Sequence, residues 1–96
     1  MKGKQRAYLR GLANGIDAKY QIGKNGVDES ALAQFEEALE ANELIKIAVL
    51  DNSLLTAREC CDAVCEKIGA EPIQVIGKKF VIYKESKKHK TIVLPK

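Results

Sequence analysis

The turn that decides the fold is the stretch Tyr20-Gln21-Ile22-Gly23-Lys24-Asn25-Gly26-Val27-Asp28. A short apolar strand is expected to end at Gly23, and a helix is expected to begin at Asp28, a residue type that caps helix N-termini. A glycine at each end of the turn allows a positive φ and leaves no Cβ in the way of a close partner. Between them lie a cation and an amide, and the following helix would direct its free N–H groups to the same place. The turn could therefore receive a phosphate, although turn geometry alone would equally explain two glycines.

Hydrophobic periodicity predicts further elements on both sides of this turn. Apolar residues at spacings of three and four indicate helices, and short apolar runs between turn residues indicate strands. We expect helices over residues 3–14, 28–41 and 54–68, and strands over residues 19–22, 44–50, 73–76 and 79–84. This order predicts an α/β fold, α-β-α-β-α-β-β, arranged as a two-layer sandwich with one small mixed four-stranded sheet. The chain of 96 residues is long enough for a single domain, 1–96, with one modest core.

The same spacing predicts which side chains face that core. In the first helix, Tyr8, Leu9 and Leu12 share one arc and should be buried, and Gly15 should end the helix in the left-handed conformation. The second strand is apolar except for Lys46, which is typical of an inner strand covered on both faces. The buried arc of the second helix should consist of Ala31, Leu32, Phe35 and Leu39.

The cysteines Cys60, Cys61 and Cys65 all fall in the third expected helix. Their spacing is neither a C-x-x-C motif nor a disulfide framework, and the one histidine, His89, lies far away in a lysine-rich segment. The apolar residues of this helix follow helical core spacing, at Ala57, Cys61, Val64, Cys65 and Ile68. We therefore expect reduced thiols that pack as small hydrophobic side chains, with no metal site and no cofactor.

Charge is segregated along the chain. Residues 1–26 carry six cations against one carboxylate, and residues 78–96 carry seven cations against one. Residues 27–43 carry six carboxylates and no cation. Two basic ends and an acidic middle are what a domain with one basic and one acidic surface would require. Solvated faces would also produce such blocks, but the first basic block includes the glycine-bounded turn.

Two further sets of cations extend the basic character of that turn. Three cations of the first helix recur every four residues and would form a solvent-facing ridge with steps of about 6 Å, close to the distance between successive phosphates on one strand. A glycine followed by a lysine at residues 77–78 favours a two-residue hairpin, whose tip would display two lysines. The candidate phosphate-binding residues are therefore Lys2, Lys4, Arg6, Arg10, Gly23, Lys24, Asn25, Gly26, Lys78 and Lys79.

Several segments resemble the CRM domain, which is named for chloroplast RNA splicing and ribosome maturation. They are Gly3-Lys4-Gln5-Arg6-x-Tyr8-Leu9-Arg10-x-Leu12-Ala13, Gln21-Ile22-Gly23-Lys24-Asn25-Gly26, Glu43-Leu44-Ile45-Lys46, Gln74-Val75-Ile76-Gly77 and Val81-x-Tyr83. The segments occur in order over nearly the whole chain. This is far more specific than a GxxG motif alone, and the similarity is to the single-domain bacterial members of the YhbY type.

The resemblance implies a fold similar to that of the C-terminal domain of translation initiation factor three. It also implies RNA binding, because the domain binds RNA and its bacterial members associate with precursors of the large ribosomal subunit. The GxxG loop of the family corresponds to residues 23–26, and its basic helix face corresponds to Lys2, Lys4, Arg6 and Arg10. The cysteines and the lysine-rich run 87–90 lie outside the family pattern, and their function stays open.

The primary hypothesis is a non-catalytic RNA-binding protein that acts on ribosomal RNA during assembly of the large subunit. The alternative is a protein-interaction module whose acidic second helix docks a basic ribosomal protein through Glu36, Glu37 and Glu40. An enzyme is least favoured, because no carboxylate pair with metal spacing and no His/Asp/Ser arrangement is visible. We expect the aromatic residues Tyr8, Tyr20, Phe80 and Tyr83 to lie mostly in the core, with stacking of one of them on a base as the alternative.

The apolar runs bear on the compartment. None approaches the roughly 18 residues that span a bilayer, and the basic N-terminus leads into no continuous apolar stretch, so no secretory signal is visible. We therefore expect a cytoplasmic protein with no membrane partner. We also expect the protein to be a monomer.

Overall fold

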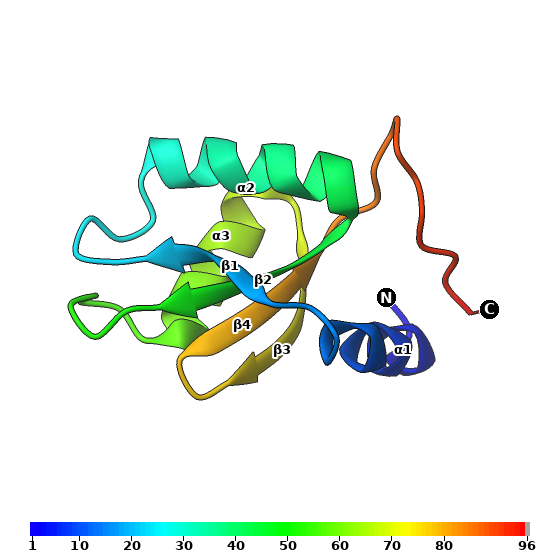
Figure 1. Ribbon diagram of the computed structural model, residues 1–96, viewed down its shortest axis with the longest axis horizontal. Helices are drawn as coiled ribbons and strands as arrows, with labels where there is room; N and C mark the ends of the chain where they lie inside the picture. Colours follow the sequence, from blue (N-terminus) through cyan, green and yellow to red (C-terminus); the bar gives the residue numbers. More distant parts are fainter. Residues whose placement is uncertain (96) are drawn as a thin grey trace.

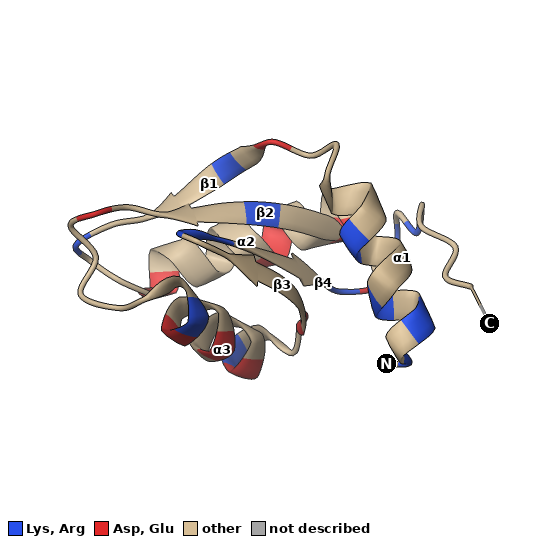
Figure 2. Ribbon diagram, turned by 90° about the horizontal axis from the view of Figure 1, so that it is seen from below, with Lys and Arg blue, Asp and Glu red and all other residues tan. Residues whose placement is uncertain are grey.

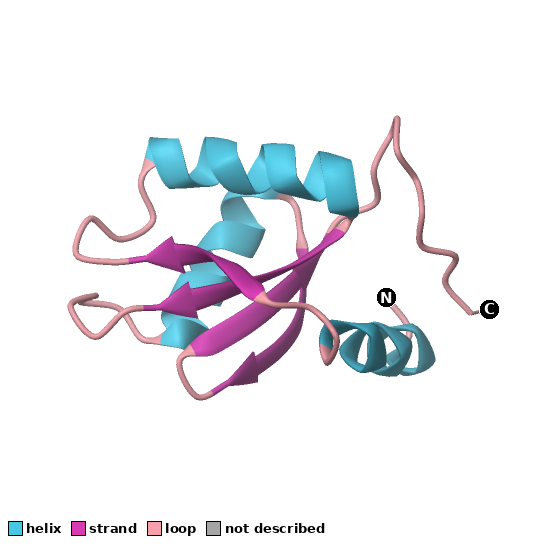
Figure 3. Ribbon diagram, in the orientation of Figure 1, coloured by secondary structure: helices cyan, strands magenta, loops and turns pink. Residues whose placement is uncertain are grey.

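Residues 1–95 are described by a computed structural model, and within them the order of elements is the predicted one. The helices are α1 (Gly3–Ala13), α2 (Glu29–Asn42) and α3 (Ala57–Ile68), and the strands are β1 (Ala18–Ile22), β2 (Leu44–Val49), β3 (Glu71–Ile76) and β4 (Lys79–Tyr83). The strands form one sheet in the order β1-β2-β4-β3 (Figure 3). β1 pairs with β2 in parallel, and the other neighbours are antiparallel. The predicted mixed α/β fold is thereby confirmed.

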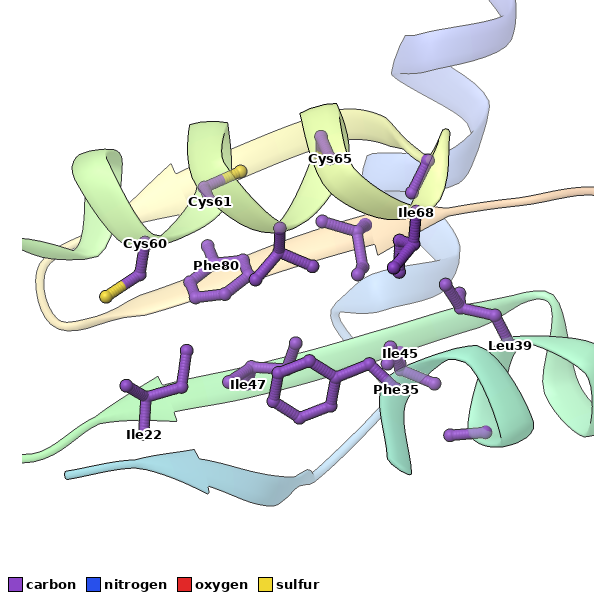
Figure 4. Packing of buried hydrophobic residues seen from close by; sticks show 14 of the residues in the cluster. Ile22, Phe35, Leu39, Ile45, Ile47, Cys60, Cys61, Cys65, Ile68 and Phe80 are labelled. Carbon is purple, nitrogen blue, oxygen red and sulfur yellow. The ribbon is translucent and has the colours of Figure 1, made fainter. Parts of the chain in front are cut away.

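The main core lies between the sheet and the helices α2 and α3 (Figure 1). Side chains alternate along β2, so that Ile45 and Ile47 face this core, where they meet Phe35 of α2 and Phe80 of β4 (Figure 4). Tyr20 of β1 packs edge-on against Phe35, with ring centroids 6.1 Å apart. The prediction that β2 is an inner strand is confirmed, because it lies between β1 and β4. The prediction that both of its faces are covered is wrong, because on the face opposite the main core only Leu44 lies under α1, and Lys46 and Ala48 are partly exposed.

A second, smaller core lies on the opposite face of the sheet, under α1. Leu9 and Ala13 of α1 are fully buried there, against Leu44 and Val81 of the strands. Leu44 and Val81 alternate with the side chains that face α2 and α3, which places α1 on the other face. In Figure 1, α1 lies at one end of the sheet and leaves the rest of this face without a helix.

Two expectations for α1 are wrong. Tyr8 and Leu12 are 43% and 37% exposed, because only the narrow stripe of Leu9 and Ala13 contacts the sheet. The helix ends through Asn14 in the right-handed conformation (φ −61°), so Gly15 is not a left-handed cap.

The expected start of α3 at residue 54 is also wrong, because this helix begins at Ala57. Thr56 caps it: the Thr56 hydroxyl accepts a hydrogen bond from the Glu59 N–H (3.1 Å), and the Glu59 carboxylate accepts one from the Thr56 N–H (2.9 Å). Leu54, before this cap, is 93% exposed. The helix ends as predicted at Gly69, which is left-handed with φ 70°.

The packing role of the cysteines is confirmed. Cys60, Cys61 and Cys65 are free thiols and are buried against the sheet (Figure 4). Burial raises the pKa of the Cys60 thiol. A hydrogen bond with Cys61 and then burial raise the pKa of the Cys65 thiol. The raised pKa values of Cys60 and Cys65 favour neutral thiols, which pack as small apolar side chains.

The chain after β4 runs back along the molecule to α1. Ile92 and Leu94 pack against the second core, and the side-chain amide of Gln5 donates a hydrogen bond to the carbonyl of Pro95 (3.1 Å). The segment 85–95, called the tail from here on, therefore lies against α1 as well as against the end of α2 (Figure 1).

Candidate functional site

The turn at residues 23–26 is a tight one. The N–H of Gly26 donates a hydrogen bond to the carbonyl of Gly23 (3.0 Å), which leaves Lys24 and Asn25 exposed at the tip. Gly26 has φ 64°, as expected for a glycine at this place. Gly23 does not have a positive φ, but a Cβ there would lie 3.2 Å from Oδ1 of Asn52. Gly26 is therefore required by the backbone conformation, whereas at Gly23 a Cβ would make a tight contact with the Asn52 side chain.

A hollow of ≈ 360 Å³ lies beside this turn, and the first turn of α2 forms one of its walls. The helix start offers free N–H groups and the positive end of the helix dipole. The Asp28 carboxylate already accepts the N–H of Ala31 (2.8 Å), so one of these donors is occupied. Asn52, from the loop after β2, completes the hollow. Sequence reasoning missed Asn52, because only the parallel pairing of β1 and β2 brings their two following loops together.

The β3–β4 hairpin lies at the same end of the sheet as the turn (Figure 1). Its predicted two-residue tip is confirmed, with Gly77 at φ 56° and Ile76 paired to Lys79. Lys78 forms an ion pair with Asp51. Lys79 is exposed. This end of the sheet therefore displays Lys24 and Lys79. It also displays Lys78, whose charge is partly neutralised by Asp51.

The cations of α1 lie at the opposite end of the molecule, which measures 39 Å along its longest axis (Figure 1). Lys2 and Lys4 are exposed, and Arg10 is half-buried. Arg6 is tied down, because its guanidinium contacts the Glu71 carboxylate (3.3 Å) and donates to the carbonyl of Pro72 (3.2 Å). The expected continuous ridge is thus interrupted by a residue that attaches α1 to β3. The candidate residues form two basic groups, one on α1 and one at the turn and hairpin, rather than one cluster.

The uncovered face of the sheet connects the two groups. Lys46 of β2 lies on this face, because Ile45 and Ile47 on either side of it point into the main core. Figure 2 shows that β2 runs from the end of the sheet near α1 towards the end that carries the hairpin. Lys46 lines a hollow of ≈ 120 Å³ with Gln74, Ile76 and Lys79. Lys46 was not predicted from the sequence as a site residue. Its signal in the sequence was that it is the one charged residue of an otherwise apolar strand.

The acidic residues lie mainly on the helices of the other face, and one of them is engaged by the tail. The Glu40 carboxylate accepts hydrogen bonds from the Ser86 hydroxyl (2.8 Å) and from the N–H groups of Lys87 (3.2 Å) and Lys88 (3.0 Å). These bonds, that of Ser86 first, lower the pKa of Glu40. Only Glu36 and Glu37 of the three proposed docking residues are exposed.

Within residues 1–95, neither a metal-binding cluster of side chains nor a membrane-spanning helix is found. Their histidines, cysteines and carboxylates form no group of three or more that could hold a metal ion. Their helices include none with the length and apolar character needed to cross a bilayer.

Comparison with protein families gives one match that spans most of the chain. The sequence model of the CRS1 / YhbY (CRM) domain matches residues 1–84.

Similar proteins come from several bacteria. "Probable RNA-binding protein YqeI" of Bacillus subtilis is 40% identical over 95 residues, which cover 99% of each chain. An "RNA-binding protein" of Haemophilus influenzae is 36% identical over 93 residues, which cover 97% of this chain and 93% of the relative. The solution structure of a hypothetical protein from Staphylococcus aureus, a candidate RNA-binding protein, has a TM-score of 0.82 at 45% identity and covers 99% of both chains.

Proposed function

Because this chain belongs to the CRS1 / YhbY (CRM) domain family, we propose that it is a non-catalytic RNA-binding protein that contacts the RNA backbone with two separate basic groups. One group is formed by the exposed Lys2 and Lys4 and the half-buried Arg10, at the start of α1 and along it, and the other is the turn 23–26 with Lys79. The observation that carries the proposal is the placement of both groups at the two ends of one sheet, while most acidic residues lie on the helices behind it (Figure 2).

The chemistry of the turn suits a phosphate. The Gly23–Gly26 hydrogen bond fixes the turn, so that the Lys24 ammonium and the Asn25 amide are presented to solvent from a defined backbone. An ammonium group binds a phosphate as a point charge, and an amide donates a hydrogen bond to its oxygens. The start of α2 adds N–H groups on the hollow beside the turn, apart from the one that Asp28 occupies.

Binding of this kind discriminates little between base sequences. Each neutralised phosphate releases counterions, so affinity falls steeply with salt. Contacts to phosphates fix the position of the RNA but do not read its bases. A folded RNA would be recognised by its shape and its 2′-hydroxyl groups, and at single-stranded elements.

The RNA that we propose is ribosomal RNA in precursors of the large subunit. The support is the likeness of the GxxG loop and of the first-helix cations to those of the CRM family, whose single-domain bacterial members associate with such precursors. The proposal includes a monomer that works in the cytoplasm and needs no cofactor.

A salt series with a structured ribosomal RNA fragment tests this function. The double variant Lys24→Glu/Arg10→Glu reverses one charge in each basic group, and Lys67→Glu on α3 is the matched control. We expect salt-dependent binding by the wild type and the control, and loss of binding by the double variant. Equal binding by all three proteins would remove both groups from the interface. Absence of binding by the wild type at low salt would refute RNA binding itself.

A further inference from the structure

A hollow of ≈ 480 Å³ lies beside the end of α1, and Lys46 of β2 is one of the residues that line it. Its walls are formed by the end of α1, the linker to β1, the beginnings of β1 and β2, the end of α2 and the tail. Its volume falls in the range of about 300–1,000 Å³ that small-ligand sites occupy.

One part of the lining is apolar. Leu12 of α1, Ile16 of the linker and Ile92 of the tail contribute to it, from three separate segments of the chain. Leu12 is 37% exposed, which leaves apolar surface available to a ligand. Ile16 and Ile92 pack against the second core, so their positions are supported from behind.

The other part of the lining is polar, and it offers both kinds of hydrogen-bonding group. Lys19 and Lys46 provide ammonium groups, and neither forms an ion pair within residues 1–95. The Asn42 side chain donates its N–H to the carbonyl of Ala38 (3.1 Å), which orients its own carbonyl oxygen. Asp17 supplies a carboxylate, an acceptor for a hydroxyl or amino group.

Such a lining matches one unit of an RNA strand. A nucleotide combines an anionic phosphate, a 2′-hydroxyl and an amphipathic base, and single-stranded RNA is recognised through bases that leave the stack. A purely apolar ligand would leave Lys19 and Lys46 without partners, and a free anion would leave the apolar wall unused. Lys46 also lines the hollow that contains Lys79, so one lysine borders both the hollow beside α1 and the hollow next to the hairpin.

We propose that this hollow holds one unstacked nucleotide of the bound RNA. The base lies against Leu12, Ile16 and Ile92, and the phosphate lies at Lys19 and Lys46. Asp17 and Asn42 accept hydrogen bonds from the 2′-hydroxyl or from the base. The assignment rests on the proposed RNA-binding function and adds to it a preference for a single-stranded segment.

The test uses a fluorescent decauridylate, a single strand with little base stacking, and anisotropy as the readout. Lys46→Gln and Lys19→Gln remove one charge each at nearly constant side-chain length, and Lys67→Gln on α3 is the matched control. We expect each of the first two variants to bind decauridylate about tenfold more weakly than the wild type, and the control to bind equally well. Unchanged binding by both variants, with circular dichroism confirming their fold, overturns the nucleotide site.

Nuclear magnetic resonance with uridine monophosphate supplies a second readout. We expect the amide resonances of Gly15, Ile16 and Asp17 to shift in the wild type and to stay unchanged in Lys46→Gln. Shifts confined to other segments overturn the proposal. Binding of the structured ribosomal fragment without any effect of Lys46 or Lys19 on decauridylate would refute the nucleotide site alone. Failure of the wild type to bind either RNA would refute the function as well.

Discussion

The carboxylate of Glu43 accepts a hydrogen bond from the backbone N–H of Ile92 at 2.8 Å, although 49 positions separate the two residues. The same oxygen accepts the N–H of Thr91 (2.6 Å), and the other oxygen accepts the N–H of Ser86 (2.9 Å). Glu43 is fully buried and left-handed, with φ 65°. One buried carboxylate thus holds both ends of the tail's first loop and fixes Ile92 in the wall of the proposed nucleotide site.

Replacement of Glu43 by glutamine should release the tail. The amide that replaces one oxygen is a donor, and it would face an N–H donor in a buried place. We expect Glu43→Gln to lower the free energy of unfolding by about 2–3 kcal/mol, measured by urea denaturation. The exposed Glu36→Gln on α2 is the control, with a change of at most about 0.5 kcal/mol. Coincident unfolding curves for Glu43→Gln and the wild type would contradict this role of Glu43.

The attachment of the tail should depend on pH. Burial alone would raise the pKa of Glu43, but the hydrogen bonds from Ile92, Ser86 and Thr91 outweigh it, and the net pKa is lowered from 4.5. The pKa of Glu40 is lowered too, by its bonds to Ser86 and Lys88. A carboxyl with a lowered folded-state pKa stabilises the fold fully above its unfolded value, and this stabilisation is lost as the pH falls through the folded value.

We therefore expect the contribution of Glu40 and Glu43 to the free energy of unfolding to be constant from pH 7 down to pH 4.5, the ordinary pKa of a glutamate. Below pH 4.5 this contribution should decrease. Urea unfolding across this range, with amide exchange of residues 86–92 as a local probe, measures the effect. Glu43→Gln should show a shallower loss on acidification than the wild type. An equally steep loss in both proteins would assign the acid sensitivity to other carboxylates.

The turn should need a glycine at position 26 for conformational reasons. With φ 64°, an alanine there costs about 1–2 kcal/mol, whereas asparagine tolerates the left-handed region better. We expect Gly26→Ala to be less stable than Gly26→Asn in urea denaturation. A Cβ at this position has no heavy atom within 4 Å, so steric contact does not confuse the comparison. Equal stability of both variants would argue against backbone strain.

The exposure of Tyr8 predicts a role in binding rather than in stability. Tyr8 is 43% exposed and lies one helical turn before Leu12, which lines the proposed nucleotide site. Stacking of a base on an aromatic ring contributes about 1–3 kcal/mol. We expect Tyr8→Ala to bind decauridylate at least about fivefold more weakly and to unfold at nearly the wild-type urea concentration. Leu54→Ala, at an exposed loop, is the control. Loss of stability without loss of binding would assign Tyr8 to packing.

The sequence predicted those features that local signals determine. The cap at Asp28, the left-handed Gly69 and the hairpin at Gly77 each follow from a few neighbouring residues. The true start of α3 was also encoded locally, in the Thr56–Glu59 capping box, but the apolar residues before it suggested an earlier start. Hydrophobic periodicity predicted the buried residues of α3 correctly, because this helix packs along the sheet. It predicted those of α1 incorrectly, because α1 contacts only one end of the sheet.

The arrangement of the site depends on contacts that no local pattern contains. Charge segregation predicted a basic surface, yet the distance between α1 and the turn follows from the sheet order β1-β2-β4-β3. Arg6 contacts Glu71, and Glu43 binds the tail. Each of these contacts joins residues that are more than 40 positions apart in the sequence. Lys46 became a candidate only when the structure left its face of the sheet uncovered.

The measurement that tests the central claim most directly is ultraviolet crosslinking of the wild-type protein to a structured ribosomal RNA fragment, with mass spectrometry of the crosslinked peptides. We predict crosslinks in α1 and in the turn 23–26, and further crosslinks near Lys46 if a strand crosses the uncovered face of the sheet. Crosslinks confined to α2 and α3, on the opposite face, would contradict the account.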